Sequence, residues 1–573
     1  MLKLPYGESN FKTVIEDGYF YQDRSMYIRE LEDKATKYVF YLRPSRFGKS
    51  LFVSMLRYYY GLEHKAQFQE FFGKLDIGKT PTPLANHYMV LPFEFSRIDT
   101  DSFKNTYEGF QSNVLLGVQD FFNAYGDWFT EAQQEQILSK KQPNEVLKSL
   151  FNFYKKNKVP HPIYVMIDEY DHFANELISF NFKYFEKSVT QNGFVRKFYE
   201  TIKTATWDGV VGRVFVTGVS PVTLDSMTSG FNIASNVSLF KEFHALMGFE
   251  ESEVEEILQG IGVPEEKMSI TLDDLRAWYD GYLFNIKAEK HIYNPDMVLY
   301  FAMRYQLDKA YPEDLLDSNI ASDYSKIRNL FKIQGREEDH LIVLDKLIND
   351  GSINAQLTTQ FSLVRRFSHD DLVSLLFYMG FLTIKEKTIG SFVFRFPNYV
   401  IERLYADYFV EMLQQQQGLP IDSSQLNFAL REIALNGTPQ YLYDEVTKIL
   451  KVLSTRDAQG FTENSLKAIF ISLLKQQQFF YVHSEYESQR QYVDIFLETI
   501  RGQGVKFEVA FELKYVKKDI KIDLEAELAK AKIQLMHYMV SKKFIERPAL
   551  KAFVVLVHGT VIHSREMDLS IKT

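Results

Sequence analysis

The chain has 573 residues, of which 46% are hydrophobic and 25% are charged, so it should form about two to four soluble globular domains. It contains no cysteine, which excludes disulfide bonds, thiolate metal sites and a cysteine nucleophile. The formal net charge of −9 argues against a uniformly basic nucleic-acid binder.

A β-type run near the N-terminus leads directly into a Gly-Lys-Ser loop. Residues 38–42 are apolar or aromatic, and a helical pattern begins at Leu51. A strand, a tight loop and a helix in this order cradle phosphates, because backbone N–H groups and the positive end of the helix dipole face the anion. We expect Lys49 to reach the β- and γ-phosphates and the Ser50 hydroxyl to hold Mg²⁺. Arg43 stands where the full G-x-x-x-x-G-K-[ST] pattern has its first glycine.

A second stretch, residues 163–171, is strongly apolar and ends in acids. It fits a buried parallel strand, and ligands of open α/β sheets bind at the carboxyl ends of such strands. We expect Asp168 to hold Mg²⁺ through water and Glu169 to polarise an attacking water. A further strand at 214–220 has a polar end, which would either sense the γ-phosphate through Thr217 or Ser220 or form a turn. The βαβ order predicts an α/β P-loop NTPase core with a parallel sheet.

The middle of the chain has a different pattern. A polar helix start at 368–372 is followed by a β-hairpin pattern at 383–396 and another helix from about Tyr399, which suits a helical, winged-helix-like region. A segment rich in Gln, Gly, Pro and Ser then indicates a domain boundary. The expected organisation is a P-loop domain at 1–305, the winged-helix-like region at 306–412, a linker at 413–424 and a C-terminal α/β domain at 425–573.

Strands with polar residues inside them dominate the C-terminal part. Glu512 and Lys514 are two residues apart, so both point to one face of a strand, and Asp494 lies on the neighbouring strand. Two carboxylates with a lysine would bind a divalent cation, for which Mg²⁺ suits oxygen ligands, and would hold an attacking water. The plain alternative is a surface Glu/Lys pair on a half-exposed strand. The expected strands are 479–485, 492–498, 505–515 and 552–557, with a helix at 524–540.

Several separated motifs resemble the bacterial AAA-ATPase-like family, in the family's order over roughly residues 8–300. They are the R-P-x-R-F-G-K-S loop within 41–51, the acidic strand end at 167–171, and the segments 215–220, 247–254, 278–282 and 293–295. The resemblance implies an ATP-binding α/β core in which Arg43 belongs to the family's own loop. The expected nucleotide contacts are Arg43, Arg46, Phe47, Gly48, Lys49, Ser50, Leu51 and Asp168, with Ser50 and Asp168 holding Mg²⁺.

Residues 460–560 resemble the PD-(D/E)XK nuclease superfamily, which has a restriction-endonuclease-like α/β fold. Asp494 matches the family's Asp, Glu512 and Lys514 match its E-x-K, and Gln534 with Tyr538 matches the Q-x-x-x-Y of one branch. Tyr492-Val493 stands where the family often has Gly-Arg. The resemblance implies catalysis by Asp494, Glu512 and Lys514, metal binding by Asp494 and Glu512, and support from Gln534, Tyr538 and an additional acid, Glu485.

The two resemblances lead to one hypothesis and one alternative. The hypothesis is an ATP-binding and ATP-hydrolysing protein coupled to a Mg²⁺-dependent nuclease that cleaves nucleic acid, with DNA favoured. Residues 501–573 carry 14 Lys and Arg against 9 Asp and Glu, which suits a polyanion. The alternative is a nucleotide-switched signalling or binding protein with a silent nuclease-like domain. No apolar run approaches the ~18 residues of a membrane span, so we expect a cytoplasmic protein, with homo-oligomerisation open.

Overall fold

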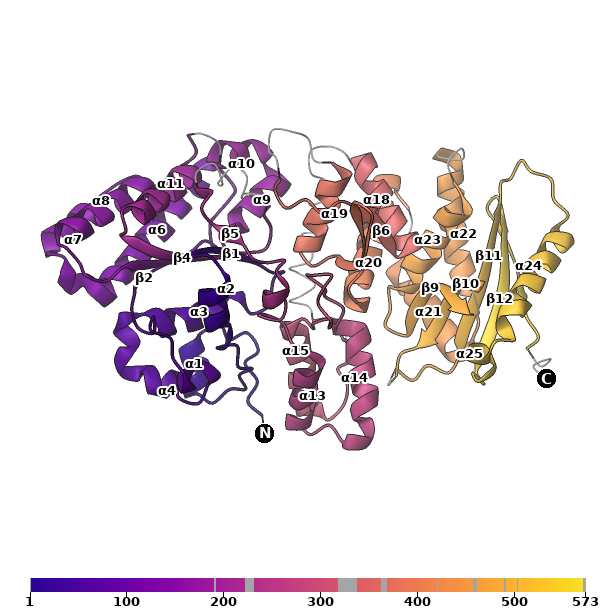
Figure 1. The fold of residues 1–573 in the computed structure, drawn as a ribbon. Helices are drawn as coiled ribbons and strands as arrows, with labels where there is room; N and C mark the ends of the chain where they lie inside the picture. The colour runs from indigo at the N-terminus through magenta and orange to yellow at the C-terminus, as the bar shows by residue number, and fades with distance from the viewer. Residues whose placement is uncertain are drawn as a thin grey trace. The chain divides into compact units, whose positions relative to one another are not determined.

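A computed structural model shows the arrangement of the chain (Figure 1). It describes residues 2–189, 192–221, 231–317, 337–361, 368–419, 421–456, 461–488, 491–501 and 503–569. The chain divides into two compact units, residues 1–337 with 354–398 and residues 338–353 with 399–573. Within the described residues, no helix is both long enough and apolar enough to cross a membrane.

A five-stranded parallel sheet of order β2-β3-β4-β1-β5 forms the centre of the first unit. Leu42 pairs with Gly218 and Glu94 pairs with Asp168, so the carboxyl ends of β1 to β4 meet at one edge. The central strands are buried along almost their whole length, which explains their unbroken apolar runs. The strands are β1 (Tyr38–Leu42), β2 (Met89–Glu94), β3 (Ile163–Asp168), β4 (Val211–Gly218) and β5 (Ser235–Asn236).

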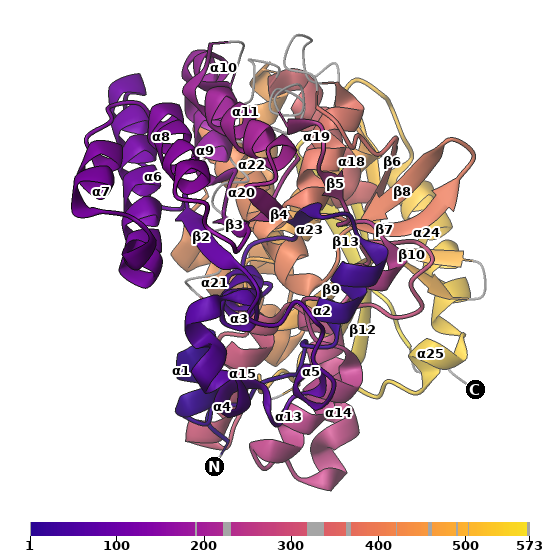
Figure 2. The same ribbon diagram turned by 60° about the vertical axis from the view of Figure 1, so that its left-hand side comes forward.

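Helices cover both faces of this sheet, which confirms the predicted α/β class. Figures 1 and 2 show α6, α8 and α11 on one side of the sheet and α3 on the other. Side-chain caps begin several of them, such as Ser102 at α6 and Asn294, followed by Pro295, at α15. The helices of this part are α1 (Phe11–Glu16), α2 (Tyr27–Lys34), α3 (Lys49–Tyr60), α4 (Phe68–Phe72), α5 (Asp76–Lys79), α6 (Phe103–Tyr125), α7 (Glu131–Leu138), α8 (Pro143–Lys156), α9 (His172–Phe180), α10 (Phe182–Val189), α11 (Phe194–Trp207), α13 (Glu251–Gly260), α14 (Glu265–Tyr279) and α15 (Pro295–Asp308).

The helix and hairpin predicted in the middle of the chain are both present. A capping box between Ser368 and Asp371 begins α19 (His369–Tyr378), and β7 (Thr383–Thr388) pairs antiparallel with β8 (Ser391–Arg395). A short strand, β6 (Ser352–Ala355), completes a sheet of order β6-β8-β7. The winged-helix-like character of this region stays a prediction.

The second unit is built on a mixed five-stranded sheet of order β13-β12-β11-β10-β9. Its central pair, β11 and β12, is parallel, and the other neighbours are antiparallel, including the predicted β10–β11 pair. The strands are β9 (Phe480–Ser488), β10 (Gln491–Thr499), β11 (Glu508–Val516), β12 (Leu550–His558) and β13 (Val561–Glu566). Strand β13 was not predicted from the sequence, because this exposed edge strand has only two apolar residues, Val561 and Ile562.

The helices of the second unit are α18 (Glu337–Asp350), α20 (Tyr399–Gln417), α21 (Ser423–Asn436), α22 (Gln440–Arg456), α23 (Glu463–Leu474), α24 (Leu524–Met539) and α25 (Lys542–Ile545). Of the segment 413–424 expected to link two domains, residues up to Gln417 therefore belong to α20, and α21 begins at Ser423. The division of the chain into the four expected segments stays a prediction.

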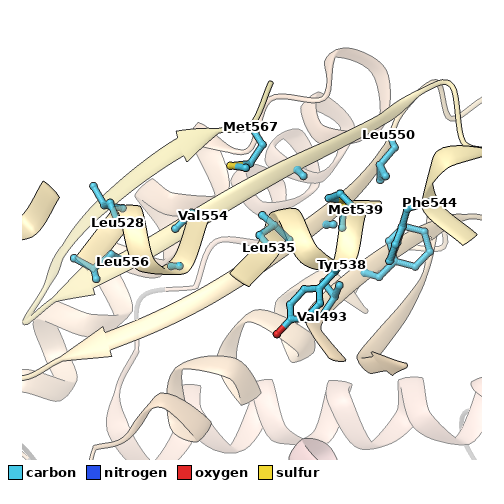
Figure 3. Packing of buried hydrophobic residues seen from close by; sticks show 14 residues of the cluster. Val493, Leu528, Leu535, Tyr538, Met539, Phe544, Leu550, Val554, Leu556 and Met567 are labelled. Carbon is cyan, nitrogen blue, oxygen red and sulfur yellow. The ribbon is translucent and has the colours of Figure 1, made fainter. Parts of the chain in front are cut away.

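One apolar cluster fixes α24 on the sheet of the second unit. Leu528, Ala531, Leu535 and Tyr538 recur at helical spacing and pack against apolar side chains of the sheet such as Val554. Figure 3 shows this packing, with Tyr538 beside Val493 and its hydroxyl oxygen at the margin of the cluster. The cluster thereby holds the last turns of α24 close to β10.

Candidate functional site

The loop between β1 and α3 has the backbone of a tight phosphate-binding turn. Arg46 has a φ of 64° and Gly48 a φ of 90°, and α3 begins at Lys49. The Lys49 ammonium donates to the carbonyl oxygens of Arg43 at 3.1 Å and Pro44 at 2.9 Å. Burial lowers the pKa of Lys49, and the Glu169 carboxylate opposes this effect. The loop therefore wraps around its own lysine at the positive end of a helix.

Arg43 points into the protein interior. Its guanidinium donates to the carbonyl oxygens of Leu42, Ser238, Phe243 and His244 at 2.8–3.2 Å. It also lies over the rings of Tyr41 and Phe284, at 4.5 and 4.1 Å from their centroids. Arg43, at 1% exposure, thus joins the start of the loop to the segment after β5.

The other loop residues lie along a cavity of ≈ 320 Å³. Arg46 forms an ion pair with Asp296 at 2.9 Å, and both side chains line this cavity. Phe47 is buried edge-on against Tyr282 and Phe284. The cavity lining includes Phe20, Tyr21, Arg46, Phe47, Gly48, Lys49, Ser50, Leu51, Phe52, Glu169 and Asp296, whereas Arg43 and Asp168 do not line it.

The predicted acids lie at the carboxyl end of β3, next to this loop. Asp168 accepts hydrogen bonds from the Thr217 hydroxyl and from the Glu169 N–H, the latter at 3.1 Å. Glu169 has a φ of 50°, a conformation rare for a side chain of this size. Burial raises the pKa of Glu169, and the Lys49 ammonium offsets part of the rise. The structure therefore brings Lys49, Asp168, Glu169 and Thr217 together at one edge of the sheet.

The second predicted site lies on β10 and β11. Ile495 on β10 pairs with Phe511 on β11, and the two strands are antiparallel. Asp494 therefore lies opposite Glu512 on the adjacent strand. Asp494 Oδ2 accepts a hydrogen bond from the Leu513 N–H at 2.8 Å. The Lys514 ammonium lies 3.0 Å from Glu512 Oε1. The three predicted catalytic residues are therefore neighbours in space.

Glu512 is the most unusual member of this group. Its exposure is 0%, and within the described residues no hydrogen bond of ordinary geometry reaches either carboxylate oxygen, so the Lys514 ion pair is its main compensation. Burial raises the pKa of Glu512 to about 7, with Asp494 adding to the rise and Lys514 opposing it. Burial raises the pKa of Asp494 as well. Two neighbouring carboxylates in a buried place are costly, and a bound cation would compensate the part of the cost that Lys514 does not offset.

Two residues of this site were not among the sequence predictions. Glu463, in the first turn of α23, lies 3.7 Å from the Lys514 ammonium and accepts from the Tyr515 N–H at 3.1 Å. Lys467, one turn later and 5% exposed, lies 3.9 Å from Asp494 Oδ1. A charged pair four residues apart at the start of a largely apolar helix was the available signal, but this spacing also fits an exposed helix face.

The supporting residues are placed in different ways. Gln534 donates to the Tyr538 hydroxyl at 2.8 Å, and the Asp494 and Glu512 carboxylates contribute to a raised pKa of Tyr538, whose main cause is burial. Glu485 belongs to β9, where its neighbours Ser484 and Tyr486 pair with Ile495 and Val493. The Glu485 side chain lies outside the described part of the structure.

The donor set at β10 and β11 suits a hard divalent cation held partly by the protein. Within the described ranges, no three His, Cys, Asp or Glu side chains converge closely enough to hold a metal ion alone. The available oxygens are those of Asp494 and Glu512, and the described partner of the Glu512 carboxylate is the Lys514 ammonium at 3.0 Å. Mg²⁺ commonly takes one or two carboxylates and completes its shell with water and substrate phosphate, so the residues fit such an ion.

Comparisons with known proteins match two separate parts of the chain. Residues 5–228 match the family described as "Predicted AAA-ATPase", and residues 461–566 match the "PD-(D/E)XK nuclease superfamily". An "Uncharacterized protein in vnfD 5′ region" of Azotobacter chroococcum mcd 1 is 26% identical over 326 residues, which are 55% of each protein, so the chain spans about half the length of this curated relative.

A solved structure, the Walker-type ATPase PABY2304 of Pyrococcus abyssi, aligns with 67% of this chain and 94% of its own at 12% identity. The TM-score of this alignment is 0.36. The two family matches confirm the two resemblances seen in the sequence: residues 5–228 form a predicted AAA-ATPase domain, and residues 461–566 form a PD-(D/E)XK nuclease superfamily domain.

Proposed function

We propose that this protein binds and hydrolyses ATP in its first unit and cleaves nucleic acid, preferentially DNA, with a divalent metal ion in its second unit. The observation that carries the nuclease half is Glu512, a fully buried carboxylate beside Asp494 whose described partner is the Lys514 ammonium at 3.0 Å. A chain that keeps two such carboxylates together in a buried place gains stability when a cation binds there.

The ATP half rests on the loop around Lys49. The Lys49 ammonium would exchange the carbonyl oxygens of Arg43 and Pro44 for the β- and γ-phosphates. The Ser50 hydroxyl and Asp168 would hold the Mg²⁺ that accompanies ATP, and the Thr217 hydroxyl would keep Asp168 in place. Glu169 would accept the proton of the attacking water, and the rise of its pKa on burial makes its carboxylate a stronger base.

In the second unit, Asp494 and Glu512 would hold the metal ion. A bound divalent ion supplies positive charge at the phosphodiester and makes a bound water more acidic. Lys514, 3.0 Å from Glu512, would orient the attacking water and stabilise negative charge on the phosphate. The hydrogen bond between Gln534 and Tyr538 would fix the positions of these two side chains beside the site.

The test is a cleavage assay on the full chain with DNA and RNA, with Mg²⁺ or Mn²⁺, and with and without ATP. We expect Asp494→Ala and Lys514→Ala to abolish metal-dependent cleavage while ATP affinity stays unchanged. Lys530→Ala is the matched control, because Lys530 is an exposed lysine of α24 paired only with Glu527 among the contacts described. Cleavage at the parental rate in both site variants would show that the nuclease assignment is wrong.

The net charge of −9 favours a second candidate, a nucleotide-switched binding or signalling protein with a silent nuclease-like domain. It predicts no cleavage of any of these substrates by the parent protein, together with ATP-dependent, stoichiometric binding of a protein partner. Cleavage that requires Asp494 would exclude it.

A further inference from the structure

The carboxylate of Asp171 binds the end of a neighbouring strand instead of its own helix. Asp171 stands at the N-cap position of α9, where an aspartate usually accepts N–H groups of the helix that it begins. Among the hydrogen bonds described, none joins this carboxylate to a backbone N–H of α9. It accepts the Val219 N–H at 3.0 Å on Oδ1 and the Ser220 N–H at 2.6 Å on Oδ2. Asp171, at 1% exposure, therefore clamps the backbone that follows β4.

The close approach of this carboxylate explains the glycine at the end of β4. A Cβ on Gly218 would lie 2.3 Å from Asp171 Oδ1 and 2.4 Å from the Tyr170 ring, closer than non-bonded atoms approach. The Gly218 carbonyl oxygen accepts the Arg43 N–H at 3.1 Å, at the start of the loop between β1 and α3. The end of β4 is thus held from two sides, by Asp171 and by the loop that contains Lys49.

Thr217, the residue before this glycine, connects the clamp to Asp168. The Thr217 carbonyl oxygen accepts the Tyr170 N–H at 3.0 Å, and the Thr217 hydroxyl donates to Asp168 Oδ1. The Glu169 N–H also donates to Asp168 Oδ1, at 3.1 Å. Both described hydrogen bonds of the Asp168 carboxylate therefore end on one oxygen, and Oδ2 is the oxygen left for a metal-bound water.

We propose that Asp171 is a positioning residue of the ATP-hydrolysing centre. It fixes the segment after β4, this segment fixes the Thr217 hydroxyl, and the hydroxyl fixes the orientation of the Asp168 carboxylate that would hold Mg²⁺. Asp171 does not line the cavity beside Lys49, so loss of its carboxylate should affect hydrolysis more than ATP binding. This inference rests on the proposed ATP hydrolysis and specifies how that site is built.

The experiment uses Asp171→Asn in the full chain, because asparagine keeps the shape but turns one acceptor oxygen into a donor. Without nucleotide or metal ion, amide hydrogen exchange should be at least about tenfold faster at Val219 and Ser220. Affinity for ATP without Mg²⁺ should stay within about threefold of the parental value. The kcat of hydrolysis should fall at least about tenfold, and half-maximal activity should require at least about fivefold more Mg²⁺.

A double-variant cycle tests whether Asp171 acts through Thr217. Thr217→Val keeps the shape of the side chain but removes the hydroxyl, so it should lower kcat to a similar degree. The combination of Asp171→Asn with Thr217→Val should be no more than about twofold slower than the slower single variant. Losses that multiply in the combination would overturn the inference while the ATP half of the proposed function stands.

Asp422→Asn is the matched control, because Asp422 is also an N-cap aspartate but accepts, among the contacts described, only N–H groups of its own helix α21. It should change neither kcat nor the Mg²⁺ requirement. Parental kcat and Mg²⁺ requirement in Asp171→Asn would overturn the inference alone. A parent that hydrolyses no ATP would overturn it together with the ATP half of the proposed function. If Asp171→Asn does not fold, Gly218→Ala displaces the same carboxylate and should lower kcat in the same way, and parental kcat in that variant would overturn the inference.

Discussion

Replacing Glu512 by glutamine should make the second unit more stable at neutral pH while it removes metal-dependent activity. The parent must carry a fully buried carboxylate whose described partner is Lys514, and burial raises the pKa of this carboxylate from 4.5 to about 7. At ~1.4 kcal/mol per pKa unit, this difference corresponds to about 3 kcal/mol. Glutamine has the same shape without the charge, but it removes the ion pair with Lys514. We therefore expect the free energy of unfolding to increase by about 1–3 kcal/mol.

The sign of the pH dependence follows from the same shift. A carboxyl group whose pKa is higher in the folded state favours folding only while it is protonated. The parent should therefore lose this contribution as the pH rises from 4.5 toward about 7. Glu512→Gln should lack this loss, so the two proteins should be alike at pH 4.5 and diverge above it.

The assay is urea unfolding of the full chain, followed by pulsed hydrogen exchange and mass spectrometry of peptides from β10, β11 and α24. These peptides report on the second unit alone, which is needed because a chain with two compact units need not unfold in one step. Glu525→Gln is the control, since Glu525 is exposed on α24 and should change stability by less than ~0.5 kcal/mol. Mg²⁺ should stabilise the parent but not Glu512→Gln.

A loss of more than 1 kcal/mol in Glu512→Gln at pH 7.5 would refute the reasoning. It would mean that the Glu512–Lys514 pair is a structural ion pair whose attraction exceeds the cost of burial. The carboxylate would then not mark a metal site.

Three further predictions concern the first unit. Lys49→Ala should weaken ATP binding by at least about 100-fold in a titration with a fluorescent ATP analogue. Unchanged affinity would show that the loop connects a strand to a helix without binding the nucleotide. Gly48→Ala should lower the free energy of unfolding by about 1–2 kcal/mol, because φ at this position is +90°, and thermal unfolding should show this loss. Steric clash does not contribute, since the added Cβ meets no atom within 4 Å. Arg43→Lys should lower the free energy of unfolding by about 2–3 kcal/mol, since an ammonium cannot replace a planar guanidinium bonded to four carbonyl groups; a change under ~0.5 kcal/mol in urea unfolding would contradict this.

Strand identity and the edge of the sheet at which the acids lie were predictable from the sequence. The run 163–168 is too apolar for an exposed strand, and parallel strands place their carboxyl ends together, so Asp168 and the loop before Lys49 had to be close. The contact of Thr217 with Asp168 follows from the same rule, because β3 and β4 are neighbours.

The direction of an individual side chain was not predictable in this way. Arg43 stands at the start of the loop that contains Lys49, yet its guanidinium donates to backbone carbonyl groups of residues 238–244. Those partners are about 200 residues away in the chain, and no local pattern identifies them. Lys467 was missed for a related reason: it precedes Asp494 by 27 residues in the chain, and only the packing of α23 brings the two side chains together.

The case of Glu512 shows what the structure adds to a sequence pattern. A Glu-x-Lys spacing on a strand fits equally well an exposed face with a surface ion pair, which contributes little to stability. Two features exclude that interpretation here: β11 lies between β10 and β12, and α24 covers the face that Ala510 shares with Glu512. Together they leave Glu512 with no exposed surface. Two neighbouring carboxylates in a buried place cost free energy that one lysine offsets only in part, so the presence of Glu512 beside Asp494 and Lys514 is best accounted for by a ligand that carries positive charge.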